Sequence, residues 1–171
     1  MAMMRIFVTD LAEYNERGIN GEWLDLDDYM TAEELQDYVE TDIVQPGNEE
    51  WFISDAENDF GYHVGEYESF DHLFLVKERA EQIIDQYGED AAMAIFLSGD
   101  CDFDSTTQEF YVMSGEREFD IAYDYIHECL GVSEEVLAQI EYIDYAACYR
   151  DLRMGCAEVY HNGTLYLVGV Y

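Results

Sequence analysis

A large excess of negative charge constrains this chain more than any other feature of its sequence. Forty Asp and Glu residues stand against seven Lys and Arg residues, so the formal net charge at pH 7 is −33. Small soluble domains usually carry a net charge of magnitude about 2–8. The fold must therefore keep most carboxylates in solvent and tolerate their mutual repulsion. Such a surface repels nucleic acids and anionic membranes.

The chain nevertheless contains enough apolar sequence to form a core. Hydrophobic residues make up 49% of its 171 residues, and 26 residues are aromatic, which excludes a disordered acidic tail. The acids are spread along the chain, because residues 1–64, 65–100 and 101–171 carry net charges of −15, −7 and −11. No low-complexity linker or internal repeat is present. We therefore expect the carboxylates to lie on folded elements.

Local patterns predict an α+β fold. Alternating apolar sequence predicts strands at Arg5–Leu11, Glu22–Leu26, Trp51–Ala56, Glu109–Met113, Ala157–Tyr160 and Leu165–Val170. Periodic sequence and capping residues predict helices at 31–39, Phe70–Tyr87, Glu89–Leu97, Glu116–Leu130, after Ser133 and at Asp144–Met154. Asn162-Gly163 predicts a hairpin turn, and Gly131 predicts a helix end. These elements suggest three small units: residues 1–64 (three-stranded sheet plus helix), 65–100 (helical middle) and 101–171 (sheet plus helices).

One predicted helix carries acids where folding alone would not favour them. Glu116, Asp120, Asp124 and Glu128 recur every four residues, and we expect Phe119, Tyr123, Ile126 and Leu130 to form the buried side. Like charges at this spacing destabilise a helix by about 0.2–0.5 kcal/mol per pair. The rise of about 1.5 Å per residue separates successive charges by about 6 Å. Taken alone, this row is explained well enough by an ordinary solvated face.

Acids also crowd a second region, which strengthens a functional interpretation. The candidate partner-binding carboxylates there are Asp25, Asp27, Asp28, Glu33, Glu34 and Asp37. Duplex DNA carries one charge per about 1.7 Å, so 33 charges correspond to roughly 16–17 base pairs. We interpret the carboxylates as imitating DNA phosphates, so that the protein occupies the DNA groove of another protein without binding nucleic acid itself. A halophilic surface could also explain the charge, but not its arrangement in rows.

The sequence offers little support for an enzyme. It lacks the common nucleotide-binding, zinc-protease and serine-hydrolase motifs, and we predict no cofactor and no metal. Asp100, Asp102 and Asp104 resemble the start of a calcium loop, but Ser105 and Tyr111 replace its required Gly and Glu. The four cysteines form no C-x-x-C pair, and no signal peptide or membrane-spanning segment is evident. We therefore expect a cytoplasmic location.

Two segments carry a resemblance to a known family. The opening Ile6-Phe7-Val8-Thr9-Asp10-Leu11-Ala12-Glu13-Tyr14-Asn15, followed by Gly21-Glu22-Trp23-Leu24, resembles the start of the ArdA antirestriction proteins. The segment Tyr142–Leu152, with its IDY-x-A-x-x-RDL pattern, resembles the same family near the C-terminus. The resemblance implies a DNA mimic, carried on mobile elements, that occupies the methyltransferase core of type I restriction–modification enzymes. It also implies an elongated chain of three small domains that forms a homodimer through the third.

The resemblance further identifies a segment similar to the family's antirestriction motif. It comprises Asp124, Tyr125, Ile126, His127, Glu128, Cys129, Leu130 and Gly131, with His127 and Cys129 departing from the acidic or small residues expected there. Two other functions remain open from the sequence. The chain could bind basic DNA-binding proteins in general, or, if His, Cys and carboxylates met in one pocket, it could be an enzyme.

Overall fold

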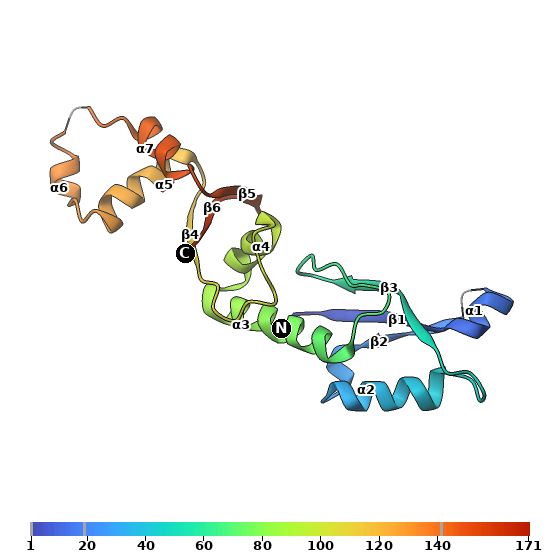
Figure 1. Cartoon of the computed structure of the whole chain (residues 1–171). Coiled ribbons are helices and arrows are strands. Elements are labelled where there is room, and N and C mark those ends of the chain that lie inside the picture. The colour runs from blue at the N-terminus through green and yellow to red at the C-terminus, as the bar shows by residue number, and fades with distance from the viewer. Residues whose placement is uncertain (1, 19, 141) are drawn as a thin grey trace. The chain divides into compact units, whose positions relative to one another are not determined.

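The computed structural model describes residues 2–18, 20–140 and 142–171 of the chain. It confirms the α+β prediction, with two small antiparallel sheets and helices packed on them (Figure 1). The chain forms two compact units, Met1–Gln86 and Tyr87–Tyr171. Two helices were predicted within residues 65–100. The first, Phe70–Tyr87, lies in the first unit except for its last residue, and the second, found at Glu89–Ser98, lies in the second unit. The division into three units and the elongated arrangement stay predictions.

The first unit is built on a three-stranded antiparallel sheet. Its strands are β1 (Met4–Asp10), β2 (Gly21–Asp25) and β3 (Trp51–Asn58), in the order β2-β1-β3. Met4, Ile6 and Val8 alternate along β1 and are fully buried, because they face the core side of the sheet. The three predicted strands are confirmed, with ends shifted by one or two residues.

Helices of the first unit begin where side chains cap them. In α1 (Leu11–Arg17), the Asp10 carboxylate accepts hydrogen bonds from the backbone N–H groups of Ala12 and Glu13. Leu11 was expected in the preceding strand, and this cap ends the strand one residue earlier. In α2 (Ala32–Tyr38), the Thr31 hydroxyl caps the first turn as predicted. A π-helical turn at Val39–Ile43 continues α2.

A buried lysine joins the long helix of this unit to the loop after β2. On α3 (Phe70–Tyr87), Lys77 Nζ lies 2.7 Å from Asp27 Oδ1 and 3.0 Å from Glu81 Oε1. Asp27 belongs to a 3₁₀ turn, Leu26–Asp28. Burial alone would lower the pKa of Lys77, but the hydrogen bonds to Asp27 and Glu81 outweigh it and raise the pKa. Lys77 therefore stays charged and neutralises part of this acidic region.

The second unit contains the second sheet. Its strands are β4 (Phe110–Gly115), β5 (Ala157–His161) and β6 (Thr164–Val170), in the order β4-β6-β5, and α4 (Glu89–Ser98) packs against β5 and β6. Asn162 and Gly163 have φ values of 48° and 81°. Two consecutive positive φ values form the tight turn expected for Asn-Gly, which confirms the predicted hairpin.

The remaining helices of the second unit differ in part from expectation. They are α5 (Glu118–Asp124), a π-helical turn (Tyr125–Cys129), α6 (Glu134–Leu137) and α7 (Tyr145–Leu152). The expected buried side of α5 was wrong, because Phe119 is 46% exposed and Leu130 is 59% exposed. Ile121 and Ala122 instead enter the core with Tyr149, Leu165 and Leu167. Phe119 and Tyr123 lie on the flank of the helix and contact Tyr145 of α7.

Candidate partner-binding surface

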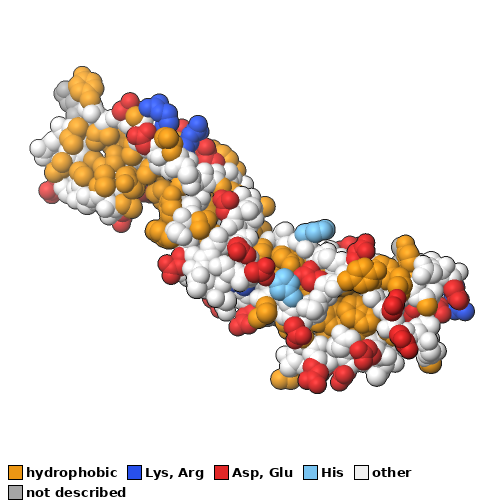
Figure 2. Space-filling view, in the orientation of Figure 1, with side chains coloured by type: hydrophobic (Ala, Val, Ile, Leu, Met, Phe, Trp, Pro, Cys, Tyr) orange, Lys and Arg blue, Asp and Glu red, His pale blue; other side chains and the backbone are white. Residues whose placement is uncertain are grey.

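The clearest row of exposed carboxylates lies on α2 and the π turn that follows it. Glu33, Asp37 and Glu40 are exposed and follow one another at intervals of four and three residues. Leu35, Val39 and Ile43 are buried and have a similar spacing. Positions three or four apart share one side of a helix, so α2 and its π turn separate an acidic outer row from an apolar inner row. Carboxylates are visible over this part of the molecule in Figure 2.

Sequence reasoning missed Glu40 and its neighbour Asp42, although both are exposed. The signal was available, since Glu40 follows Asp37 by three residues and so continues the row that begins at Glu33. Glu34, which was predicted as a partner contact, has a local role in addition. Its carboxylate accepts a hydrogen bond of 2.8 Å from the backbone N–H of Met30, which fixes the approach to α2.

The three aspartates before α2 have different surroundings. Asp25 is partly buried, and its carboxylate accepts a hydrogen bond of 3.0 Å from the backbone N–H of Asp27. Asp27 is held by Lys77, as described above. Asp28 is exposed. Of the three, Asp28 is the one whose position most favours a contact with a partner.

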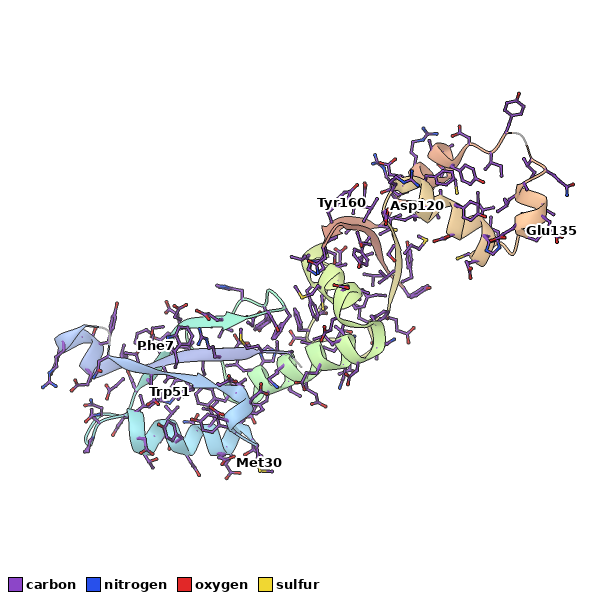
Figure 3. All side chains as sticks on the ribbon, turned by 180° about the vertical axis from the view of Figure 1, so that it is seen from behind. Phe7, Met30, Trp51, Asp120, Glu135 and Tyr160 are labelled. Carbon is purple, nitrogen blue, oxygen red and sulfur yellow. The ribbon has the colours of Figure 1, made fainter. Side chains whose placement is uncertain are left out.

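The predicted row on α5 is shorter than expected. Glu116 is exposed but lies between β4 and Arg117, the N-cap of α5, so its predicted place on the helix was wrong. The reason is a cap supplied by the Asp120 carboxylate. Asp120, labelled in Figure 3, accepts hydrogen bonds from the Arg117 backbone N–H at 3.0 Å and from its guanidinium at 2.9 Å. This starts the helix after Arg117.

Asp120 is therefore a structural carboxylate as well as a candidate contact. The hydrogen bond from Arg117 holds the pKa of Asp120 below its usual value of 3.8. The same bond raises the pKa of Arg117. Asp124 and Glu128, by contrast, are exposed, and they are the members of this row that remain available to a partner.

The motif-like segment 124–131 begins at the last residue of α5 and runs through the π turn. The backbone N–H of Leu130 donates to the carbonyl oxygen of Tyr125 at 3.1 Å, and Gly131 has a φ of 68°. The predicted ending at Gly131 is thus confirmed, since this backbone conformation favours glycine. His127 stacks on Tyr123 with ring centroids 6.1 Å apart and an angle of 6° between the rings. Packing accounts for His127 without a catalytic role.

Most cations of the chain are used in internal ion pairs. These pairs include Arg5–Glu57, Arg17–Glu13, Lys77–Asp27, Lys77–Glu81, Arg117–Asp120 and Arg153–Glu158. Each joins residues of the same unit. Lys77 and Arg117 in particular are held by acids of their own units, which favours contacts of the remaining carboxylates with a basic partner.

Two further properties of the described residues bear on other functions. In residues 2–18, 20–140 and 142–171, no group of three or more His, Cys, Asp or Glu side chains is arranged to hold a metal ion. In the same part of the chain, no helix is long and apolar enough to cross a membrane.

Comparison with known proteins places the chain in a family. The sequence pattern of a family described as "Antirestriction protein (ArdA)" matches residues 6–166, which is nearly the whole chain. A comparison with curated proteins gives no match. Members of the matching family inhibit restriction enzymes and are not themselves enzymes. The match includes both segments on which the resemblance was noted, and it covers both compact units. The chain therefore belongs to the ArdA family of antirestriction proteins.

Proposed function

We propose that the protein inhibits a type I restriction–modification enzyme by occupying the DNA-binding groove of its methyltransferase core. Family membership supports an antirestriction role, and the carboxylate rows support the mode of action. The observation that carries the proposal is the arrangement of α2 and α5. Each buries an apolar side and exposes acids, while Lys77 and Arg117 are taken up by internal pairs. A groove lined with Lys and Arg for DNA phosphates would bind such rows.

The test of this proposal is a charge reversal on α5 and its π turn. The double variant Asp124→Lys/Glu128→Lys is expected to weaken inhibition of DNA cleavage at least about tenfold, because two attractive contacts become repulsive. Asp120 is left unchanged because its carboxylate accepts the hydrogen bonds from Arg117 that cap the start of α5. The measurement is the concentration of protein that halves cleavage by the purified enzyme, together with displacement of labelled target DNA.

A matched control separates the position of charge from its amount. Asp100 and Asp151 are exposed residues of the same unit that lie outside the α5 row. The variant Asp100→Lys/Asp151→Lys makes the same change in net charge and is expected to alter inhibition by no more than about threefold. Equal losses for the two variants would contradict a specific role for Asp124 and Glu128. They would favour general binding to basic proteins.

We also propose that the protein acts as a homodimer through its second unit. Apolar side chains are exposed there between α5 and α7, including Leu130 (59%), Val136 (47%), Ile140 (45%) and Tyr142 (90%). Such a group is unusual on a monomer and typical of an interface. Sedimentation equilibrium is expected to show a dimer, and Leu130→Ser/Ile140→Ser is expected to shift it toward monomer. A parent protein that remained monomeric at all measured concentrations would refute this part of the proposal.

A further inference from the structure

An aromatic pocket lies on the sheet of the first unit, on the side opposite the buried residues of β1. It has a volume of about 400 Å³ and is lined by Phe7, Tyr14, Trp23, Phe52, Ser54, Asp55 and Glu66. Phe7 of β1 pairs with Trp23 of β2, next to the pairing of the buried Ile6 with Leu24. Because successive residues of a strand face opposite sides, Phe7 and Trp23 lie on the outer side. Figure 3 labels Phe7 on this sheet.

The rings in this pocket hold one another in position. Phe7 and Trp23 meet edge to face with centroids 5.4 Å apart, and Tyr14 and Phe52 do the same at 5.2 Å. Tyr14 remains 40% exposed, whereas Phe52 is 9% exposed and anchors the pair. Each edge-to-face contact covers a face of only one ring of the pair, and a ring face that stays open carries partial negative charge. The pocket is therefore preformed and suited to a cation.

Two carboxylates complete the lining. Asp55 follows the irregularity in the pairing of β1 with β3, and Glu66 comes from the segment that runs beside β3. The backbone N–H of Ile53 donates to the carbonyl oxygen of Glu66 at 2.8 Å, which fixes that segment against the strand. Both side chains are exposed. Figure 2 shows hydrophobic side chains over this unit with carboxylates around them.

The same sheet already binds one guanidinium in this manner. The Arg5 guanidinium carbon lies 4.8 Å from the centroid of the Trp23 ring. Arg5 also forms an ion pair with Glu57 on β3. An aromatic face and a carboxylate on the neighbouring strand thus suffice to hold an arginine here. The pocket offers the same two kinds of group, with more rings and two carboxylates.

We propose that this pocket binds the guanidinium of an arginine side chain presented by a protein partner. The planar guanidinium can stack on the rings while its N–H groups donate to Asp55 and Glu66. An anion would be repelled by these carboxylates and by the net charge of −33. An apolar group would offer no hydrogen-bond donor to the two carboxylates. The choice of the restriction enzyme as the source of this arginine rests on the proposed function, since the DNA-binding grooves of proteins are rich in lysine and arginine.

The first experiment tests the pocket without any enzyme. The probe is N-acetyl-L-arginine amide, and the control is N-acetyl-L-citrulline amide, which has nearly the same shape but no charge. Two-dimensional ¹H–¹⁵N NMR spectra of the full chain resolve the indole N–H groups of its two tryptophans. The arginine probe is expected to shift the Trp23 signal saturably at millimolar concentration and to leave Trp51 unchanged, whereas citrulline shifts neither. An absent Trp23 shift, or equal shifts with both probes, would overturn the proposal.

The second experiment asks whether the enzyme uses the pocket. Asp55→Asn/Glu66→Gln is compared with Glu49→Gln/Glu50→Gln, which removes the same charge from the exposed loop before β3. The pocket variant is expected to weaken binding to the restriction enzyme about tenfold more than the control. Equal effects of the two variants would refute use of the pocket by the enzyme. A parent protein that does not inhibit would instead refute the proposed function, and the probe experiment would still decide on the pocket.

Discussion

Inhibition by this protein is expected to weaken with rising salt, but less steeply than the binding of DNA by the same enzyme. A protein that contacts six to ten phosphates loses about 10³–10⁵ in DNA affinity between 50 and 200 mM salt, because condensed counterions are released from the duplex. The duplex carries a charge every 1.7 Å or so. Exposed acids at positions four apart on α2, such as Glu33 and Asp37, are separated by about 6 Å along the helix.

The wider spacing decides the size of the effect. Carboxylates this far apart condense few counterions, so most of the salt dependence should come from ordinary screening between the two surfaces. We expect a loss of affinity of about ten- to a hundredfold over the same range of salt. The protein should therefore become a stronger competitor relative to DNA as salt increases.

The measurement is a competition between the protein and labelled target DNA for the purified enzyme at four or more salt concentrations. The thermal midpoint of the free protein serves as a control. It should rise with salt, because screening reduces the repulsion among the 40 carboxylates, which only seven Lys and Arg residues offset. A salt dependence as steep as that of DNA would contradict the spacing argument. Binding that ignored salt altogether would contradict phosphate imitation.

Much of the fold was predictable from local sequence. The hairpin at Asn162-Gly163, the cap at Thr31 and the ending at Gly131 each depend on one or two residues whose backbone or side-chain chemistry allows few alternatives. The strands of both sheets followed from alternation in the same way. These features are local, so the sequence around them is sufficient.

The errors arose where a distant contact or a side-chain cap decided the outcome. Nothing in the pattern of residues 116–130 indicates that the Asp120 carboxylate accepts from the backbone N–H and guanidinium of Arg117 and so starts the helix after Glu116. Nor does it show that Ile121 would enter the core of α7 and β6 in place of Phe119. The ion pair of Asp27 with Lys77 joins residues 50 positions apart. No local pattern could therefore have shown that Asp27 is held by a lysine while its neighbour Asp28 is simply exposed.

The aromatic pocket could not be predicted from the sequence for a related reason. Its rings come from β1, α1, β2 and β3, and each of them alone looks like an ordinary core residue in the sequence. Only the pairing of the strands puts Phe7 beside Trp23 on the outer side of the sheet. Carboxylate rows can thus be found from periodicity along one element, whereas a pocket assembled from four elements requires the fold.

The largest loss of stability is expected on removing Asp10. This carboxylate is 1% exposed and accepts four hydrogen bonds. Two come from the backbone N–H groups of Ala12 and Glu13, at 2.9 and 3.1 Å. Two come from the Gln45 backbone N–H and the Asn48 side-chain amide, both at 2.8 Å. Asp10 thus joins the start of α1 to the loop before β3, which is 35–38 residues away in sequence.

Replacing Asp10 by Ala is expected to lower the free energy of unfolding of the first unit by about 3–5 kcal/mol, because several buried donors lose their acceptor. Asp10→Asn is a sharper test. Its amide can keep one oxygen toward α1, but its NH₂ group then faces the donors of Gln45 and Asn48. We expect this nearly isosteric change to cost at least about 2 kcal/mol. The control Asp85→Ala, on an exposed part of α3, should change stability by no more than about 0.5 kcal/mol.

The advantage of Asp10 over Asn should also depend on pH in a defined direction. Burial alone would raise the pKa of Asp10, but the hydrogen bonds from Asn48, Gln45, Glu13 and Ala12 outweigh it and hold the pKa below 3.8. A carboxylate with a lowered pKa in the folded state adds stability above its unfolded pKa, and this is lost as pH falls through the folded pKa. Urea unfolding followed by tryptophan fluorescence reports on the first unit, because Trp23 and Trp51 both belong to it. The difference between the parent and Asp10→Asn should be constant from about pH 5 to 7 and shrink below about pH 4. A difference that stayed the same at pH 3 would show that Asp10 acts through shape and not through its charge.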